Sequence, residues 1–200
     1  MKEKRVFKDL AVVTASTAMI GLATCCYVRS GLGSDAVAVF QEGLSSFAGF
    51  SLGTAAWCLN IGLLTAAFLM ARRHMAWTTV FNSLLCGPFI DLMNWLMDLV
   101  FGLSDGLLYH CVLFAVGILL VASACALMIR HCSGMTVNDA ITTAIAERLG
   151  CSFRVVRMSI DGALMLSGFL MGGVVGIGSV IAVLGTGPLI QFFYQFGEKS

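Results

Sequence analysis

The sequence predicts an all-α fold: a polytopic transmembrane helix bundle of about six spans, built as two inverted three-span repeats. Three observations support this prediction. Hydrophobic residues make up 58% of the chain and charged residues 12%, whereas soluble domains are about 45–50% apolar and about 25% charged. Apolar runs of spanning length recur along the chain. The two prolines lie in similar Gly-Pro elements 100 residues apart.

Six apolar runs approach or exceed the length of about 20 residues that crosses a bilayer. We expect spans over 10–28, 51–71, 76–98, 107–129, 156–172 and 174–195. The first is expected to be a retained helix, because no small-residue cleavage site follows it. Gly172 and Gly173 alone separate the last two spans. A single helix there would extend about 60 Å, twice the hydrocarbon thickness, so we expect a tight turn.

Basic residues sort onto one side of the membrane if the N-terminus is placed inside. Eleven of the twelve then face the cytoplasm, and Arg29 faces outward. Those inside are Lys2, Lys4, Arg5, Lys8, Arg72, Arg73, Arg130, Arg148, Arg154, Arg157 and Lys199. This asymmetry follows the positive-inside rule, so we expect both termini to be cytoplasmic.

A repeat becomes visible when the chain is shifted by 100 residues. Gly87-Pro88, in the run "GPFID", then meets Gly187-Pro188, in "GPLIQ". We assign residues 9–100 to a first repeat and 107–196 to a second, within a single membrane domain of residues 1–200. Because each repeat holds an odd number of spans, the second must cross the membrane in the opposite sense. Inverted repeats of this kind recur in secondary transporters.

The Gly-Pro elements interrupt apolar helices, where proline removes a backbone donor and frees the carbonyl one turn earlier. Those carbonyls belong to Leu84 and Leu184, and in lipid they need partners. One interpretation places each break against the bundle interior or a water-filled cavity, so that Pro88 and Pro188 both face inward. The other is a packing kink that duplication copied.

Two short polar-capped segments, 34–48 and 136–150, follow the first and fourth spans. Asp35 and Asp139 suit helix N-caps, and Gly150 suits a helix stop. Each segment either lies along the membrane interface as an amphipathic helix or dips into the membrane as a re-entrant helix.

Polar residues inside the predicted spans are candidates for function, because they are costly in a membrane. Asn60, Asp91, Asp161 and Gln191 occupy corresponding places in the two halves. If the symmetry holds, they converge on one substrate or proton site, since an acid in low dielectric has a raised pKa. The alternatives are an outer-headgroup position for Asp91 and an i,i+4 ion pair between Asp161 and Arg157.

Other functional classes have no signal in the sequence. Most of the eight cysteines lie in apolar runs, where a thiol behaves as a small hydrophobe, and no ligand cluster has metal spacing. No Ser-His-Asp set, H-E-x-x-H or phosphate-binding loop appears, and no basic patch with aromatic residues suggests nucleic acid. We therefore expect no enzyme, no metal or cofactor and no nucleic-acid partner. The expected partners are the lipid bilayer, a small solute or ion, and a second copy in a homo-oligomer.

Several stretches resemble the YczE/YitT-like bacterial membrane proteins. They are "GLGSDA" at 31–36, "VNDA" at 137–140 and "GGVVGIGSVIAVLGTGPLIQFF" at 172–193. The family's Gly-x-Gly-Thr element appears at 176–179 as "GIGS" and at 76–79 as "AWTT", two departures from its pattern. The resemblance implies a bacterial plasma-membrane protein of the shorter YczE type and supplies no catalytic residues.

Two functions from different classes are compatible with these features. The first is a small secondary transporter or permease, which the repeat, the interrupted helices and the intramembrane acids favour. The second is a regulatory or assembly protein that transports nothing, which the small size of the bundle favours.

Overall fold

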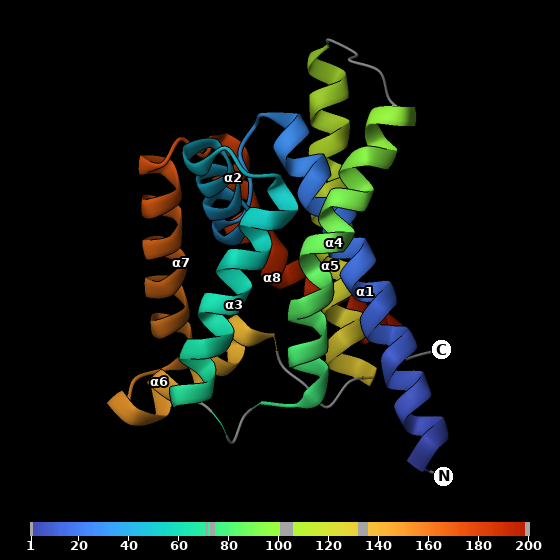
Figure 1. Ribbon diagram of the computed structural model, residues 1–200, viewed down its shortest axis with the longest axis vertical. Coiled ribbons are helices and arrows are strands. Elements are labelled where there is room, and N and C mark those ends of the chain that lie inside the picture. Colours follow the sequence, from blue (N-terminus) through green and yellow to red (C-terminus); the bar gives the residue numbers. More distant parts are fainter. Residues whose placement is uncertain (1, 71, 73–74, 101–105, 132–135, 199–200) are drawn as a thin grey trace.

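The computed structural model describes residues 2–70, 72, 75–100, 106–131 and 136–198, and this part of the chain forms eight α-helices and no strand (Figure 1). In chain order these are α1 Lys2–Ser30, α2 Ala36–Ala48, α3 Leu52–Met70, α4 Trp77–Val100, α5 Leu107–His131, α6 Val137–Leu149, α7 Phe153–Leu170 and α8 Ile177–Glu198. The all-α prediction is confirmed.

Four helices are long and apolar enough to cross a membrane. The spanning stretches are Phe7–Ser30 in α1, Leu52–Met70 in α3, Trp77–Leu99 in α4 and Leu107–Ile129 in α5. The apolar part of α8, Ile177–Phe193, is shorter. Helix α7 begins with Arg154, Arg157 and Asp161 in its first three turns, which dilutes its hydropathy. By length and composition, the described residues therefore support a transmembrane bundle with four spans.

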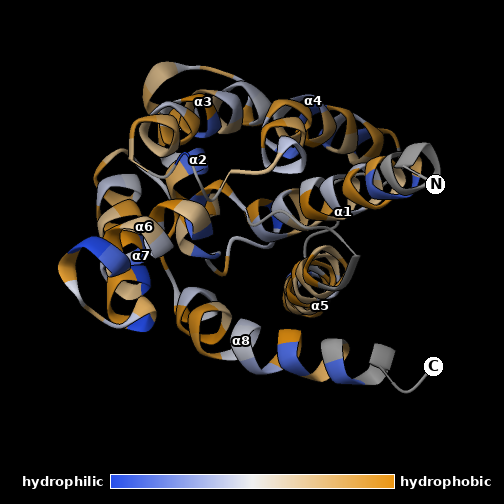
Figure 2. Ribbon diagram, turned by 90° about the horizontal axis from the view of Figure 1, so that it is seen from below, coloured by the Kyte–Doolittle hydropathy of each residue, from blue (hydrophilic) through white to orange (hydrophobic). Residues whose placement is uncertain are grey.

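Helix α1 lies between α4 and α5 and packs against both (Figure 2). Helix α3 packs against α4, and α8 packs against α5. The two short helices lie across other elements: α2 contacts α7 and α3, and α6 contacts α3 and α7. In Figure 1, α2 lies in the upper half of the bundle and α6 in the lower half.

The ends of α2 and α6 follow their local sequence. The Asp35 side chain caps α2 by accepting the Ala38 N–H at 2.8 Å, so its predicted capping role is confirmed. Gly49 and Gly150 end the two helices in the left-handed region, with φ of 69° and 64°, a conformation that glycine adopts without steric cost. Asp139 is not the cap of α6, because Thr136 takes that position and accepts the Asp139 N–H.

The expected turn between the last two helices is present. Helix α7 ends at Leu170, and the Gly172 and Gly173 N–H groups donate to carbonyls of its last turn. Gly172 has a φ of 99°, which a side-chain-bearing residue rarely adopts.

Glycines allow the close crossing of α2 and α7. A Cβ at Gly43 would lie 2.2 Å from the Gly168 carbonyl oxygen, and a Cβ at Gly168 would lie 2.6 Å from the Phe40 Cα. Neither position has space for a side chain, so the contact depends on backbone meeting backbone.

The Gly-Pro elements lie inside α4 and α8, which are both continuous helices. Gly87 is buried, but Pro88, Gly187 and Pro188 are exposed. Neither proline is therefore packed in the bundle interior, one of the two inward positions that the sequence predicts. The backbone of Gly87 packs on α3, because a Cβ at Gly87 would lie 2.6 Å from the Gly53 carbonyl oxygen. The adjacent proline ring is therefore turned outward.

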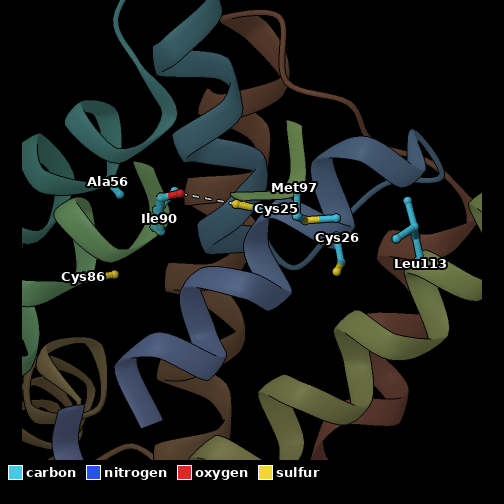
Figure 3. Close-up of a cluster of buried hydrophobic side chains, with 7 residues drawn as sticks. All are labelled: Cys25, Cys26, Ala56, Cys86, Ile90, Met97 and Leu113. Carbon is cyan, nitrogen blue, oxygen red and sulfur yellow. Dashed lines mark hydrogen bonds between the residues drawn. The ribbon is translucent and has the colours of Figure 1, made fainter. Parts of the chain in front are cut away.

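A core cluster joins α1, α3, α4 and α5 (Figure 3). It contains Cys25, Cys26, Ala56, Cys86, Ile90, Met97 and Leu113. The Cys25 thiol donates to the Ile90 carbonyl at 3.4 Å (Figure 3), and Cys26 and Cys86 are buried in the same cluster. These thiols fill the core as the sequence predicts. Among the described residues, no group of three His, Cys, Asp or Glu side chains could hold a metal ion.

Arg29, the basic residue expected outside, is tied to α4. Its Nη2 contacts the Asp98 carboxylate and donates to the Asn94 carbonyl and side-chain oxygens at 3.1 and 3.0 Å. The end of α1 is thereby joined to the end of α4.

Candidate functional site

Charged side chains gather where the first turns of α2 and α6 approach α7. Asp35 precedes α2, and Asn138 and Asp139 lie in the first turn of α6. Arg157 and Asp161 lie one turn apart on α7. We call these five residues the interior polar cluster.

Arg157 is the centre of this cluster. Its Nη1 pairs with the Asp139 carboxylate, and its Nε donates to Asp161 Oδ2 at 2.9 Å. The side chains of all three residues are between 26% and 33% exposed, so water screens these pairs only in part. The predicted Arg157–Asp161 ion pair is confirmed, and the pairing of Arg157 with Asp139 adds a second acid that the sequence analysis assigned to capping.

Asn138 extends the cluster on the other side of Asp161. Its Nδ2 donates to Asp161 Oδ1 at 3.5 Å, so the two carboxylate oxygens face different partners. The Asn138 side chain is buried, and its Oδ1 has no hydrogen-bond partner among the described residues. Buried polar atoms are nearly always paired in proteins, so this oxygen is a candidate ligand atom.

Asp35 lies within electrostatic reach of the same charges. Burial raises the pKa of its carboxyl group, and the negative charge of Asp161 raises it further. The Ala38 N–H and the positive charge of Arg157 lower that pKa. The start of α2 and the middle of α7 therefore share one electrostatic environment.

Helices α1 and α5 contribute neutral groups beside the cluster. Tyr27 on α1 interacts electrostatically with Asp35, and Cys125 on α5 interacts with Asp35 and Asp139. The Tyr27 hydroxyl and the Ser34 Oγ are both buried and have no partner among the described residues. Together with Asn138, they bring three unpaired oxygen atoms to the region of the acids.

The four residues predicted from the sequence lie in separate surroundings. Asp161 belongs to the interior polar cluster, as described. Asp91 accepts the Gly53 N–H at 2.9 Å and the Ser51 hydroxyl at 2.8 Å. It thus satisfies donors at the first turn of α3, a helix start whose own sequence offers no acid.

Asn60 and Gln191 complete the predicted set. Asn60 is partly buried on α3 and makes a side-chain hydrogen bond with Cys86 of α4. Gln191 is exposed on α8. Within the described part of the chain, no hydrogen bond or ion pair joins these two residues to Asp91 or Asp161.

The sequence analysis did not predict the cluster as a whole. The spacing of Arg157 and Asp161 was a usable signal, because residues four apart share a helix face. The contact between Arg157 and Asp139 had no signal in the local sequence, since it depends on the angle at which α6 and α7 meet after Gly150.

Comparisons with known proteins agree with a membrane location. The chain is 25% identical over 187 residues to a Haemophilus influenzae protein with the name "Uncharacterized protein", covering 94% of this chain and 84% of that one. It is 24% identical over 150 residues to the "Uncharacterized membrane protein YczE" of Bacillus subtilis, covering 74% of this chain and 68% of that one. No solved structure gives a significant match.

The apolar helices and the similarity to a membrane protein make this chain a membrane protein. Residues 7–195 match the family of unknown function DUF6198. The match covers most of the chain, and the similarity to YczE agrees with the motifs described above. The chain belongs to this YczE-like family, DUF6198.

Proposed function

We propose that the chain is a small secondary transporter, or permease, of the bacterial plasma membrane. In this proposal it crosses the membrane six times as two inverted three-span halves, with both termini in the cytoplasm. The interior polar cluster is the place where a solute or ion binds, and Asn60, Asp91 and Gln191 lie outside it.

The packing of the helices supports the inverted halves. Helix α1 contacts α4 as α5 contacts α8, and α2 contacts α3 as α6 contacts α7. Across the halves, α2 contacts α7 as α6 contacts α3. Small residues stand at both of these crossings: Gly43 and Gly168 in one, and Ala144 and Ala67 in the other.

One difference separates the halves. Helix α3 packs closely on α4, whereas α8 runs away from α7 in both views (Figures 1 and 2). Two copies of one unit in different arrangements are what a transporter needs if its halves exchange roles during alternating access.

The single observation that carries the proposal is the position of the interior polar cluster. Helices α2 and α6 have 13 residues each, about 20 Å of helix, which is too short to span. Their first turns both adjoin the Arg157–Asp161 part of α7. Half-helix ends beside charged groups, inside a membrane, are typical of ion and substrate pathways.

A solute-uptake screen in proteoliposomes tests the proposal. We expect a solute whose uptake depends on the protein and is lost in Asp161→Asn, while Asp98→Asn, which removes an acid outside the cluster, transports normally. Both variants are matched by yield and by insertion into the vesicles. Equal uptake in vesicles with and without protein, across the screen, would reject transport.

A regulatory or assembly protein is the second candidate function. An open surface on one face of α1 favours it, formed by Phe7, Leu10, Ala11, Thr14, Ala15 and Ala18. These residues are apolar apart from one hydroxyl and include none of the cluster, so this face suits an apolar partner helix better than a polar solute. The test is a crosslinker placed at Ala11 in cells. A crosslink to another protein that forms equally well with and without added solutes would favour this candidate.

A further inference from the structure

The interior polar cluster has more negative than positive groups. Asp35, Asp139 and Asp161 supply three carboxylates, and Arg157 supplies one guanidinium. The starts of α2 and α6 add roughly half a positive charge each through the helix dipole. If every acid is ionised, the cluster is left with a deficit of about one positive charge.

Three residues next to these acids in the chain, bonded to them or interacting with them electrostatically have oxygen atoms without partners: Ser34 precedes Asp35, Asn138 donates to Asp161, and Tyr27 interacts with Asp35. The side chains of Tyr27 and Ser34 are 1% exposed and that of Asn138 is 7% exposed. Their hydroxyl and amide oxygens accept no hydrogen bond from the described residues. Leaving buried oxygens unpaired costs free energy, and a bound ligand with positive charge would satisfy them.

We propose that the interior polar cluster, with Ser34 and Tyr27, binds one monovalent cation through oxygen ligands. The proposal rests on the transport function proposed above, in which this cation is the coupling ion. Carboxylate, amide and hydroxyl oxygens are the ligands that hard cations prefer. An alkali ion or a proton on a carboxylate would both supply the missing charge.

The ion pairs of Arg157 determine which carboxylate oxygens remain free to bind a cation. It occupies Asp139 and Asp161 Oδ2, and it leaves Asp161 Oδ1 facing the Asn138 amide. The carboxyl group of Asp35 accepts backbone hydrogen bonds from Ala38 and Val37 and has further acceptor capacity. The cation site is therefore expected on the side of Asp161 that faces Asn138 and Asp35.

Several charged or titratable groups from neighbouring helices surround the Asp35 carboxyl group. The groups that interact electrostatically with Asp35 are Tyr27 from α1, Cys125 from α5, and Arg157 and Asp161 from α7; Asp139 from α6 interacts with Cys125 and Arg157. A proton on one of the cluster's carboxylates and a bound alkali ion each neutralise the same negative charge. The two are therefore expected to compete, so that a low pH weakens binding of the alkali ion.

Thermal unfolding of the full chain in lipid nanodiscs tests the proposal without requiring transport. Sodium or potassium chloride replaces N-methylglucamine chloride at constant ionic strength, at pH 8 and at pH 5. Because a ligand of the folded state raises the unfolding temperature, we expect the alkali ion to raise it at pH 8 and to have less effect at pH 5.

Two variants and one control test whether the stabilisation by the alkali ion arises at the interior polar cluster. Asp161→Asn and Asp35→Asn each remove a charge while keeping the shape, and asparagine still caps α2 well. We expect each variant to bind the alkali ion at least tenfold more weakly. Asp98→Asn removes an exposed acid at the end of α4 and should respond as the unmodified protein does.

The outcomes separate the two sources of positive charge. A response to sodium or potassium that both cluster variants lose identifies an alkali ion. No alkali response, with a stabilisation at low pH that both cluster variants lose, identifies a proton. Neither response, or equal responses in the cluster variants and Asp98→Asn, overturns the proposal. Cation binding without any solute uptake would support the cation site and reject the transport function.

Discussion

The indole Nε1–H of Trp57 donates a hydrogen bond to the carbonyl oxygen of Leu84 at 3.0 Å. Pro88 has no N–H, so the Leu84 carbonyl lacks its usual helical donor, and a side chain of α3 replaces the lost bond in α4. In α8 the matching residue, Leu184, is 71% exposed, and no side chain of the described residues donates to its carbonyl. The two Gly-Pro elements are thus alike in sequence and different in surroundings.

Trp57→Phe should destabilise the protein by about 1 kcal/mol, because the Leu84 carbonyl loses its donor. The measurement is unfolding in detergent micelles, compared with Trp95→Phe, which replaces a tryptophan that is 58% exposed and should be neutral. In a Pro88→Ala background the helix recovers its own N–H donor, so the Trp57→Phe cost should shrink. A full cost in both backgrounds would show that ring packing, and not the freed carbonyl, explains the effect.

Gly43→Ala should destabilise the crossing of α2 and α7 by roughly 1–3 kcal/mol through overpacking. The new Cβ would lie 2.2 Å from the Gly168 carbonyl oxygen, which is backbone and cannot rotate away. Gly62→Ala is the matched control, because no atom lies within 4 Å of its Cβ position. It should be neutral or slightly stabilising, since alanine favours helix by about 0.5–1 kcal/mol. Equal unfolding temperatures in the two variants would contradict the close crossing.

Arg157→Gln should cost roughly 1–2 kcal/mol of stability, less than the 3–5 kcal/mol of a fully buried pair, since solvent screens these side chains in part. The variant leaves Asp139 and Asp161 facing each other without their shared cation. Adding Asp161→Asn should restore part of the loss, because it removes one of the two like charges. The test is a double-mutant cycle by thermal unfolding. Additive costs would mean that the ion pairs contribute nothing beyond the individual side chains.

Asp91→Ala should destabilise the start of α3 by about 1–2 kcal/mol, as the loss of an N-cap does. The Gly53 N–H and the Ser51 hydroxyl both lose their acceptor. Asp91→Asn keeps one acceptor oxygen and should cost less, while Gln191→Ala, at the exposed matching position of α8, should cost almost nothing. Hydrogen exchange of the first turn of α3 checks the location of the effect. Unchanged exchange there in Asp91→Ala would argue against capping.

Reporter fusions test the orientation of the chain and whether its number of spans is even. We expect a fluorescent protein after Ser200 to fold and glow in the cytoplasm, and alkaline phosphatase at the same place to be inactive. A truncation that fuses the phosphatase after residue 104, between α4 and α5, should be active, because the positive-inside rule places that connection outside. Active phosphatase after Ser200 would reject an even number of spans.

The sequence by itself determined the features that depend on neighbouring residues. Apolar runs predicted the helices, and cap residues such as Asp35 and Gly150 predicted where two short helices begin and end. The Gly172-Gly173 turn and the Arg157–Asp161 pair were also predicted. Backbone conformation, capping and i,i+4 contacts act within one or two turns, so the sequence within a short window contains the needed information.

Tertiary structure decided which helix faces meet. Nothing in the local sequence distinguishes Gly87, packed against Gly53, from Gly187, which has open space around it. Likewise, the meeting of Asp139 with Arg157 and the separation of Asp91 from Asp161 depend on how α3, α6 and α7 cross. Crossing geometry is set by the close fit of whole helix surfaces, as between Gly43 and Gly168, and that fit sums over many residues far apart in the chain.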